Sequence, residues 1–440
     1  MDQYFKKTRY ATVITFGCQQ NEADSEIIRG MAAEMGYVIC DEPEDCDLIV
    51  VNTCAIREHA ESKALSLLGR FKKLKQNKPD LVIGLVGCMA AEAHIVKQIT
   101  GNFKYVSFTV EPSRLDTFAE CVRRFVCDGE RSFIIGADRR LICEGVPLIR
   151  SAKHKAWVSI MYGCNNFCSY CIVPYTRGRE ISRASKDILD ECKRLADEGV
   201  LEITLLGQNV NSYKSDMNFA ELISRVAEIE GNFTVKFMTS HPKDVSDELI
   251  EAMAKYKGKI APYFHLPLQS GSSRILKKMN RTYDTERYLE VVRKLRDKIP
   301  DITISTDIIV GFPTETEDDF EKTLEILSQV EYDMVFSFIY SVRKGTPAAV
   351  MDGQVPLAVK KERMSRLLKL QDEVSLKKNE RLVGSVIRVL VDSVDESGIA
   401  SARAENNKLI HFNCDKNLVG HSVDVRVTRA CPYDLYAEII

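Results

Sequence analysis

Short apolar runs and amphipathic helical stretches alternate along the first part of the chain. Three of the apolar runs predict strands, at 10–16, 48–51 and 81–86, and a helical stretch follows each of them. Strands that alternate with helices in this way form parallel α/β sheets. The pattern therefore predicts an N-terminal α/β domain over residues 1–125.

A second series of strands and helices begins near residue 155, after a stretch at 126–150 that has no clear period and that we interpret as a linker. Strands are predicted at 156–161, 202–206, 234–239, 261–266, 302–310 and 334–340, and helices lie between them, including 185–196, 284–295 and 317–329. Six β/α units are too few for a closed eight-stranded barrel. We expect an open, partial (β/α)6 barrel over 151–377.

The pattern changes once more after a charged helix at 359–378. Short alternating runs predict about five strands, at 385–391, 399–404, 409–412, 422–427 and 435–439. Five short strands in 378–440 suggest a small β-barrel of the oligonucleotide-binding kind. The predicted fold class is α/β, with an N-terminal parallel α/β domain, a partial barrel and a small C-terminal β-barrel.

The most specific chemical signal is a run of three cysteines, Cys164, Cys168 and Cys171, on the loop after the first predicted barrel strand. Three thiolates at this spacing can hold three corners of a 4Fe–4S cube and leave one iron open to a ligand. The alternatives are a zinc site and three buried thiols. A structural zinc site needs a fourth ligand, and no Cys or His follows within the next twenty residues. The spacing favours the iron–sulfur interpretation.

A second group of cysteines is predicted from topology. Cys18, Cys54 and Cys88 each follow one of the three N-terminal strands. The carboxyl ends of parallel strands share one edge of a sheet, where ligands bind in such folds. One such cysteine alone would be interpreted as a small buried residue at the end of its strand. Three at equivalent positions favour a second metal site.

Composition limits the classes of function. The 440 residues carry a net charge of -2, so an RNA partner would have to be held by local patches. No apolar run is long enough to span a membrane, no secretory signal is expected, and fourteen cysteines favour a reducing cytoplasm. We interpret the other eight cysteines as ordinary small apolar residues: Cys40, Cys46, Cys121, Cys127, Cys143, Cys192, Cys414 and Cys431.

Local basic patches exist at three places. Residues 63–78 carry six basic and no acidic side chains, residues 359–378 carry seven basic and three acidic ones, and Arg177, Arg179 and Arg183 follow the cysteine loop. Each patch could contact RNA phosphates. The alternative, which is more common for a run of charges, is a helix face that is exposed to solvent and binds nothing. Residues 378–440 hold eight basic and nine acidic residues, so their charge does not indicate RNA binding.

Several motifs together resemble those of the radical S-adenosylmethionine (SAM) methylthiotransferases along nearly the whole chain. The matching segments are 15–21, 52–58, 87–90, 163–180, 206–212, 265–271 and 306–313. The C-terminal module resembles a TRAM domain, and the segment 177–180 favours the tRNA-modifying branch of the family. Gln20 departs from the pattern, where a Met is expected, but it is not a ligand position.

The resemblance implies two 4Fe–4S clusters. Cys164, Cys168 and Cys171 would hold the cluster that binds SAM, with Tyr170, Gln208 and Gln269 as further cofactor contacts. An auxiliary cluster, the sulfur donor, would be held by a second set of ligands: Cys18, Cys54 and Cys88.

The implied reaction uses two SAM molecules per turnover and adds a methylthio group to C2 of an N6-prenylated (dimethylallyl) adenosine next to the anticodon of tRNA. It also needs an electron donor and a sulfur source, neither of which the sequence identifies. Alternatives within the family are a ribosomal-protein aspartate or N6-threonylcarbamoyladenosine tRNA as substrate. An alternative from another class is a non-enzymatic iron–sulfur RNA-binding protein, which the open iron disfavours.

Overall fold

The computed structural model describes residues 8–55, 58–136 and 145–440. Ile56 and Arg57 of the second family motif, Cys143 and the middle of the expected linker lie outside these residues. The chain divides into two compact units. Unit 1 comprises residues 1–151, 161–165 and 171–181, and unit 2 comprises residues 152–160, 166–170 and 182–440.

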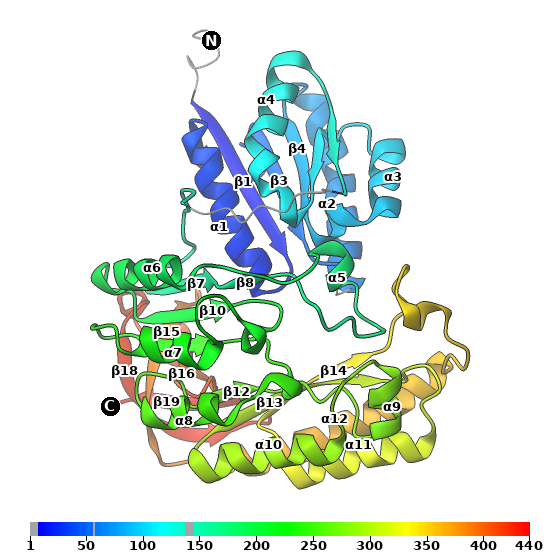
Figure 1. Ribbon diagram of the computed structural model, residues 1–440. Coiled ribbons are helices and arrows are strands. Elements are labelled where there is room, and N and C mark those ends of the chain that lie inside the picture. Colours follow the sequence, from blue (N-terminus) through cyan, green and yellow to red (C-terminus); the bar gives the residue numbers. More distant parts are fainter. Residues whose placement is uncertain (1–7, 56–57, 137–144) are drawn as a thin grey trace. The chain divides into compact units, whose positions relative to one another are not determined.

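Unit 1 is built on a six-stranded parallel sheet in the order β2-β1-β3-β4-β5-β6 (Figure 1). Its strands are β1 (Arg9–Phe16), β2 (Tyr37–Ile39), β3 (Leu48–Thr53), β4 (Val82–Gly87), β5 (Phe108–Val110) and β6 (Ser132–Ile134). The three strands predicted from the apolar pattern are β1, β3 and β4. The sheet also contains β6, so the first part of the expected linker belongs to this sheet.

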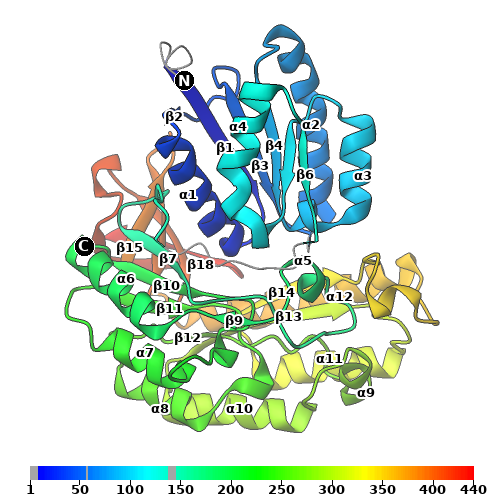
Figure 2. The ribbon, with the colours of Figure 1, turned by 45° about the horizontal axis from the view of Figure 1, so that its top comes forward.

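Helices cover both faces of this sheet (Figures 1 and 2). One face packs against α1 (Gln19–Glu34) and α4 (Phe118–Asp128), and the other against α2 (Glu58–Asn77) and α3 (Ala93–Asn102). Every residue of β3 and β4 is buried, as expected for parallel strands that are covered on both sides.

Unit 2 contains the predicted partial barrel. Its six parallel strands form two three-stranded sheets, β11-β10-β7 and β12-β13-β14, and a parallel bridge between Val235 and Ile260 joins them. The strands are β7 (Lys155–Ser159), β10 (Glu202–Leu206), β11 (Thr234–Phe237), β12 (Tyr263–His265), β13 (Thr303–Val310) and β14 (Met334–Ile339). The expectation of six strands is confirmed.

The partial barrel is covered by helices, of which α6 (Ser185–Asp197), α10 (Thr285–Lys298) and α11 (Glu317–Val330) match the predicted ones. The long helix α12 (Leu357–Glu380) packs on β14 and α11 and leads into the C-terminal module. No helix of the described residues combines the length and apolarity needed to cross a membrane.

The C-terminal module is a closed five-stranded barrel, as predicted, in the order β15-β16-β17-β19-β18. Its strands are β15 (Val386–Val394), β16 (Ile399–Ala404), β17 (Leu409–Asn413), β18 (Ser422–Ala430) and β19 (Asp434–Ile439). Two ion pairs join it to unit 2's partial barrel: Lys155–Asp392 at 2.5 Å and Lys408–Asp333 at 3.1 Å. Lys155 begins β7 and Asp333 precedes β14, so the module contacts the amino ends of the barrel strands.

Candidate metal centres

The three N-terminal cysteines meet at one edge of the sheet in unit 1. Cys18, Cys54 and Cys88 directly follow β1, β3 and β4, which are adjacent strands. The chain order reverses between β1 and β3, and ligands of doubly wound sheets bind outside the carboxyl ends at such a point. The Cys54 thiol is hydrogen-bonded to the thiols of both Cys18 and Cys88. The structure thus brings together cysteines that are far apart in the sequence.

Buried amides fix the backbone that carries these thiols. Asn52, at the end of β3, donates to the Asn21 carbonyl at 2.8 Å, and Asn21 donates to Asn52 Oδ1 at 3.1 Å. The Asn21 amide oxygen also accepts from the Cys18 backbone N–H at 3.3 Å. Gly87 before Cys88 has a φ of 97°, and a Cβ there would lie 2.4 Å from Asn52 Oδ1. A glycine is therefore required where β4 turns into the third cysteine.

The electrostatics of this group suit metal-ligating thiolates. Hydrogen bonding from Cys54 and the charge of Arg177 outweigh burial and together lower the pKa of Cys18 to about 6 and that of Cys88 to about 7. The same two hydrogen bonds raise the pKa of Cys54. Thiolates are the form that binds iron, so the donor set fits a three-cysteine cluster site. No set of three His, Cys, Asp or Glu side chains in the described residues is arranged around a single metal ion.

Arg177 lies inside this site. Its Nε donates to Cys88 Sγ at 3.0 Å, its Nη2 pairs with Asp24 at 2.8 Å, and the residue is 6% exposed. Arg183 is also buried and bonds the Ser159 carbonyl and Glu191. The expectation that these two arginines contact RNA phosphates is wrong, because both side chains are buried and each is paired with a carboxylate of the same chain. Arg179 is exposed.

The second cysteine group sits on a long loop between β8 (Met161–Tyr162) and β9 (Ile181–Ser182), which pair as a two-stranded sheet. In unit 1, the Cys164 N–H donates to the Gly178 carbonyl at 2.9 Å, and the Asn165 N–H donates to Glu180 at 3.1 Å. Gly163 has a φ of 75°, and a Cβ there would lie 2.1 Å from the Arg179 carbonyl oxygen. The segment 177–180 therefore folds back onto the start of the cysteine loop. Cys171 is partly buried.

Cys168 is held in unit 2. Arg281 Nη1 donates to Cys168 Sγ at 3.4 Å, and Arg281 also donates to the Tyr283 hydroxyl at 2.9 Å and to the Pro267 carbonyl at 3.0 Å. Burial alone would lower the pKa of Arg281, but Tyr283, Tyr170 and Cys168 raise it well above its ordinary value. Arg281 was not predicted as a site residue, because 113 positions separate it from Cys168 and no local pattern in the sequence marks it.

Several buried polar side-chain atoms lie in the loops after β10 and β11. Buried atoms of Gln208, Asn209, Asn211 and Ser240 make no hydrogen bond within the described residues. A buried polar atom without a partner costs free energy, so these loops fit a polar ligand at the carboxyl ends of the barrel strands. Gln208 was predicted as a cofactor contact on its sequence position.

Gln269, the other amide predicted as a cofactor contact, follows β12 and is 7% exposed. It has a φ of 74°. Its backbone pairs with β13, donating to the Asp307 carbonyl at 2.8 Å and accepting from Ile309 at 3.0 Å. A positive φ in a residue other than glycine is strained. Pairing with β13 holds Gln269 in this conformation, beside the motif segment 306–313.

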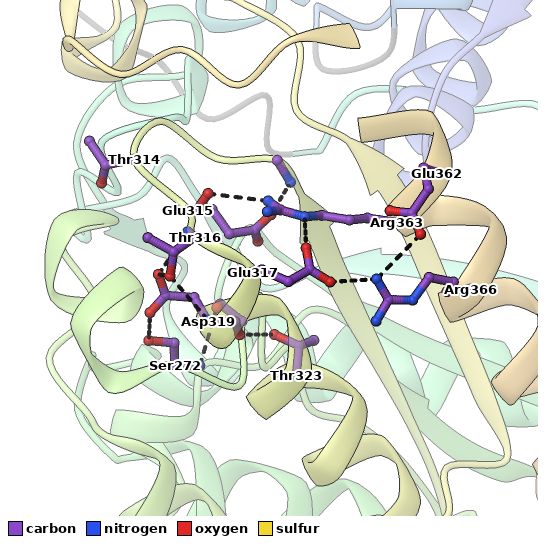
Figure 3. Close-up of polar contacts among 12 residues, drawn as sticks. Ser272, Thr314, Glu315, Thr316, Glu317, Asp319, Thr323, Glu362, Arg363 and Arg366 are labelled. Atoms are coloured by element: carbon purple, nitrogen blue, oxygen red, sulfur yellow. Dashed lines mark hydrogen bonds and ion pairs between the residues drawn. The ribbon is translucent and has the colours of Figure 1, made fainter. Parts of the chain in front are cut away.

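The two basic helices differ in how their charges are used. In α12, Arg363 and Arg366 pair with carboxylates near the start of α11 (Figure 3). Lys360 donates to the Tyr340 carbonyl, and Lys378 pairs with Asp333.

In α2, four basic side chains are exposed and make no ion pair within the described residues: Lys63, Arg70, Lys72 and Lys73. Lys75 instead reaches the Leu81 carbonyl at 2.5 Å. Of the two helices, α2 keeps more of its charge available to a polyanion.

Comparison with known families agrees with this architecture. Residues 158–327 match the Radical SAM superfamily, residues 10–110 match the uncharacterized protein family UPF0004, and residues 380–440 match the TRAM domain. The solved radical S-adenosylmethionine methyltransferase TsrM from Kitasatospora setae shares 12% identity, with a TM-score of 0.57 over 78% of this chain and 77% of that chain. That likeness shows the fold alone.

The partial barrel and its cysteine loop define a radical SAM enzyme, a class that uses a 4Fe–4S cluster and SAM. Proteins named tRNA-2-methylthio-N(6)-dimethylallyladenosine synthase match along the full chain. The one from Caldicellulosiruptor saccharolyticus is 45% identical over 100% of this chain and 94% of its own, and one from Clostridium botulinum is 47% identical over 97% and 96%. The chain belongs to this family of radical SAM tRNA methylthiotransferases.

Proposed function

We propose that this protein adds a methylthio group to C2 of N6-dimethylallyladenosine next to the anticodon of tRNA. The observation that supports it is the presence of two separate three-cysteine groups in a chain whose relatives, 45% and 47% identical, carry the name of that reaction. One cluster would suffice to cleave SAM. A second cysteine group with an open ligand position suits the delivery of sulfur.

In this proposal each cysteine group holds a 4Fe–4S cluster. Cys164, Cys168 and Cys171 ligate the cluster that binds SAM, with Tyr170, Gln208 and Gln269 as protein contacts of the cofactor. The auxiliary cluster has its own ligands, Cys18, Cys54 and Cys88. When bound, the two clusters and two SAM molecules per turnover supply the electron, the radical, the sulfur and the methyl group.

The remaining residues bind and orient. The unpaired amide oxygens of Gln208 and Asn209 supply acceptors, and the amide of Asn211 supplies a donor and an acceptor, for the polar groups of SAM. Asn21 and Asn52 hold the auxiliary thiols in place, so their contribution is positional. The exposed charges of α2 supply phosphate contacts for the RNA.

We further propose three domains: an N-terminal domain whose sheet extends through β6, beyond the predicted boundary at residue 125, the partial barrel at 151–377 and the C-terminal module at 378–440. The partners are tRNA, an electron donor and a sulfur source that restores the auxiliary cluster. A tRNA substrate and fourteen cysteines favour a cytoplasmic location.

The test uses the full chain with its clusters reconstituted without oxygen. It is incubated with SAM, a reductant and an anticodon stem-loop that carries either adenosine, N6-dimethylallyladenosine or N6-threonylcarbamoyladenosine. Mass spectrometry of the nucleosides should show methylthiolation of the dimethylallyl substrate. Methylthiolation of the threonylcarbamoyl substrate or of a ribosomal protein, and not of the dimethylallyl substrate, would overturn the assignment. RNA binding without any SAM cleavage would favour a non-enzymatic protein.

A further inference from the structure

A chain of buried polar contacts runs from α1 to the third thiol of the N-terminal group. Gln20 donates to Asp24 at 3.2 Å, Asp24 pairs with Arg177 at 2.8 Å, and Arg177 donates to Cys88 Sγ at 3.0 Å. The side chains of Asp24 and Arg177 are 3% and 4% exposed. Gln20 is the position that departs from the family pattern, and its amide adds a donor to this chain of contacts.

Each cysteine group therefore has one buried arginine that donates to one of its sulfurs, but the charges of the two arginines are balanced differently. Arg177 has the carboxylate of Asp24 as a counter-ion. Among the described residues no carboxylate contacts Arg281, whose other acceptors are the Tyr283 hydroxyl and the Pro267 carbonyl. The N-terminal site thus holds a compensated cation, whereas Cys168 faces an uncompensated one.

We propose that Arg177 and Asp24 are positioning residues that set the reduction potential of the auxiliary cluster in opposite directions, a role that rests on the proposed function of Cys18, Cys54 and Cys88. Reduction adds negative charge to a cluster. A hydrogen bond to a ligand sulfur and a nearby cation stabilise that charge and raise the potential. A carboxylate at the same site opposes the increase, and burial strengthens both effects because the local dielectric is low.

The test removes the other cluster first. In a Cys164→Ala, Cys168→Ala, Cys171→Ala background the potential of the auxiliary cluster is titrated and followed by electron paramagnetic resonance. Arg177→Met should shift the potential to a more negative value, and Asp24→Asn to a more positive value. Arg179→Met, which changes an exposed arginine two residues away, should leave the potential unchanged.

The opposite signs distinguish tuning from a purely structural role, in which both variants would lower the iron content or shift the potential in the same direction. Shifts of the same sign, or no shift, overturn the inference. If Arg177→Met alone fails to fold because it leaves the Asp24 carboxylate buried without a counter-ion, the double variant Asp24→Asn, Arg177→Met replaces it. Its potential should be more negative than that of Asp24→Asn alone. A background protein that binds no iron would overturn the auxiliary cluster itself, which is a separate outcome.

Discussion

Arg363 and Glu315 form an ion pair of 2.9 Å in which neither side chain is more than 6% exposed. The pair joins α12 to the loop after β13, and Gly311 donates to the same carboxylate at 2.7 Å. Arg366 extends the contact to Glu317 at 2.5 Å (Figure 3). A helix that looks like an RNA-binding surface in the sequence is therefore held to the partial barrel by its own arginines.

We predict that α2 contributes to tRNA binding. Changing Lys63, Arg70, Lys72 and Lys73 to Glu should weaken binding of the anticodon stem-loop and flatten its salt dependence. The logarithmic slope should fall by about 0.7–0.9 for each phosphate that the variant no longer neutralises. The measurement is binding affinity against salt concentration, with SAM cleavage as a check of folding. A control with two charge reversals on the other basic helix is Lys361→Glu with Lys369→Glu on α12. A larger decrease in affinity for that control than for the α2 variant would contradict the prediction.

The two cysteine groups should bind iron independently. Anaerobic reconstitution of the intact chain should give about eight irons per chain, and removal of either cysteine triplet should leave about four, since each cluster holds four. Iron and sulfide analysis with absorption spectra measures this. Cys192→Ala, which removes a buried thiol outside both groups, should leave the iron count unchanged. About four irons in the intact chain would show a single cluster.

The two groups should also divide the chemistry. Cys54→Ala removes the thiol that hydrogen-bonds to both of its neighbours, so it should abolish methylthiolation while reductive cleavage of SAM to 5′-deoxyadenosine continues. Cys168→Ala should abolish both. Quantification of 5′-deoxyadenosine and of the modified nucleoside in one reaction gives both readouts. Methylthio product from the Cys54→Ala variant would show that sulfur comes from elsewhere.

Local patterns predicted the architecture well because most strands are long enough to show a period. Three strands of unit 1 were not predicted: β2, β5 and β6. Each has three residues, which is too short to show a period, and each depends on its neighbours in the sheet. The loop cysteines were predictable from topology, since the carboxyl ends of parallel strands share one edge.

The side chains around the cysteines were not predictable. Arg177 lies 89 positions from Cys88 and 153 from Asp24. In the sequence it looks like any exposed arginine beside a motif. Whether an arginine is buried depends on the hydrogen-bonding and ionic partners that other elements contribute, and no periodicity in the sequence reports them. The same reason explains the wrong expectation for Arg183.

The open face of the partial barrel presents two aromatic rings. Phe336 and Phe338 alternate on β14, the last strand, and each is 42% exposed. They are in register with Asp307 and Ile309 of β13, so all four side chains share one face. Single-stranded bases stack on exposed aromatic rings, and a dimethylallyl group adds apolar surface to the base.

We predict that these two rings contribute to selection of the prenylated base. Phe336→Ala with Phe338→Ala should weaken binding of the prenylated stem-loop by roughly one to two orders of magnitude, since a stacked base contributes about 1–3 kcal/mol. Binding of the unmodified stem-loop should change less. Val350→Ala, at another exposed apolar side chain, is the control. An equal decrease in affinity for both RNAs would assign the rings to general RNA binding and contradict a role in selection.

Stability should depend on pH through a buried histidine. His241 lies in the loop after β11, is 4% exposed and accepts from the Lys243 backbone N–H through Nδ1 at 3.3 Å. Burial, with the charges of Arg281 and Lys243, lowers its pKa to about 2. The folded protein keeps this imidazole neutral, whereas the unfolded chain binds a proton below about pH 6.5. The contribution to stability is therefore fully present above pH 6.5 and is lost as the pH falls.

When the pH falls from 7.5 to 5.5, this group alone should lower the free energy of unfolding by about 1.4 kcal/mol. The reason is that the unfolded chain binds about one more proton than the folded protein over the one pH unit below the unfolded pKa. His241→Asn keeps an acceptor for the Lys243 N–H and should remove that part of the pH dependence. Denaturant unfolding at both pH values, with the exposed His421→Asn as a control, measures the difference. An unchanged pH dependence in His241→Asn would show that the imidazole is charged in the folded protein.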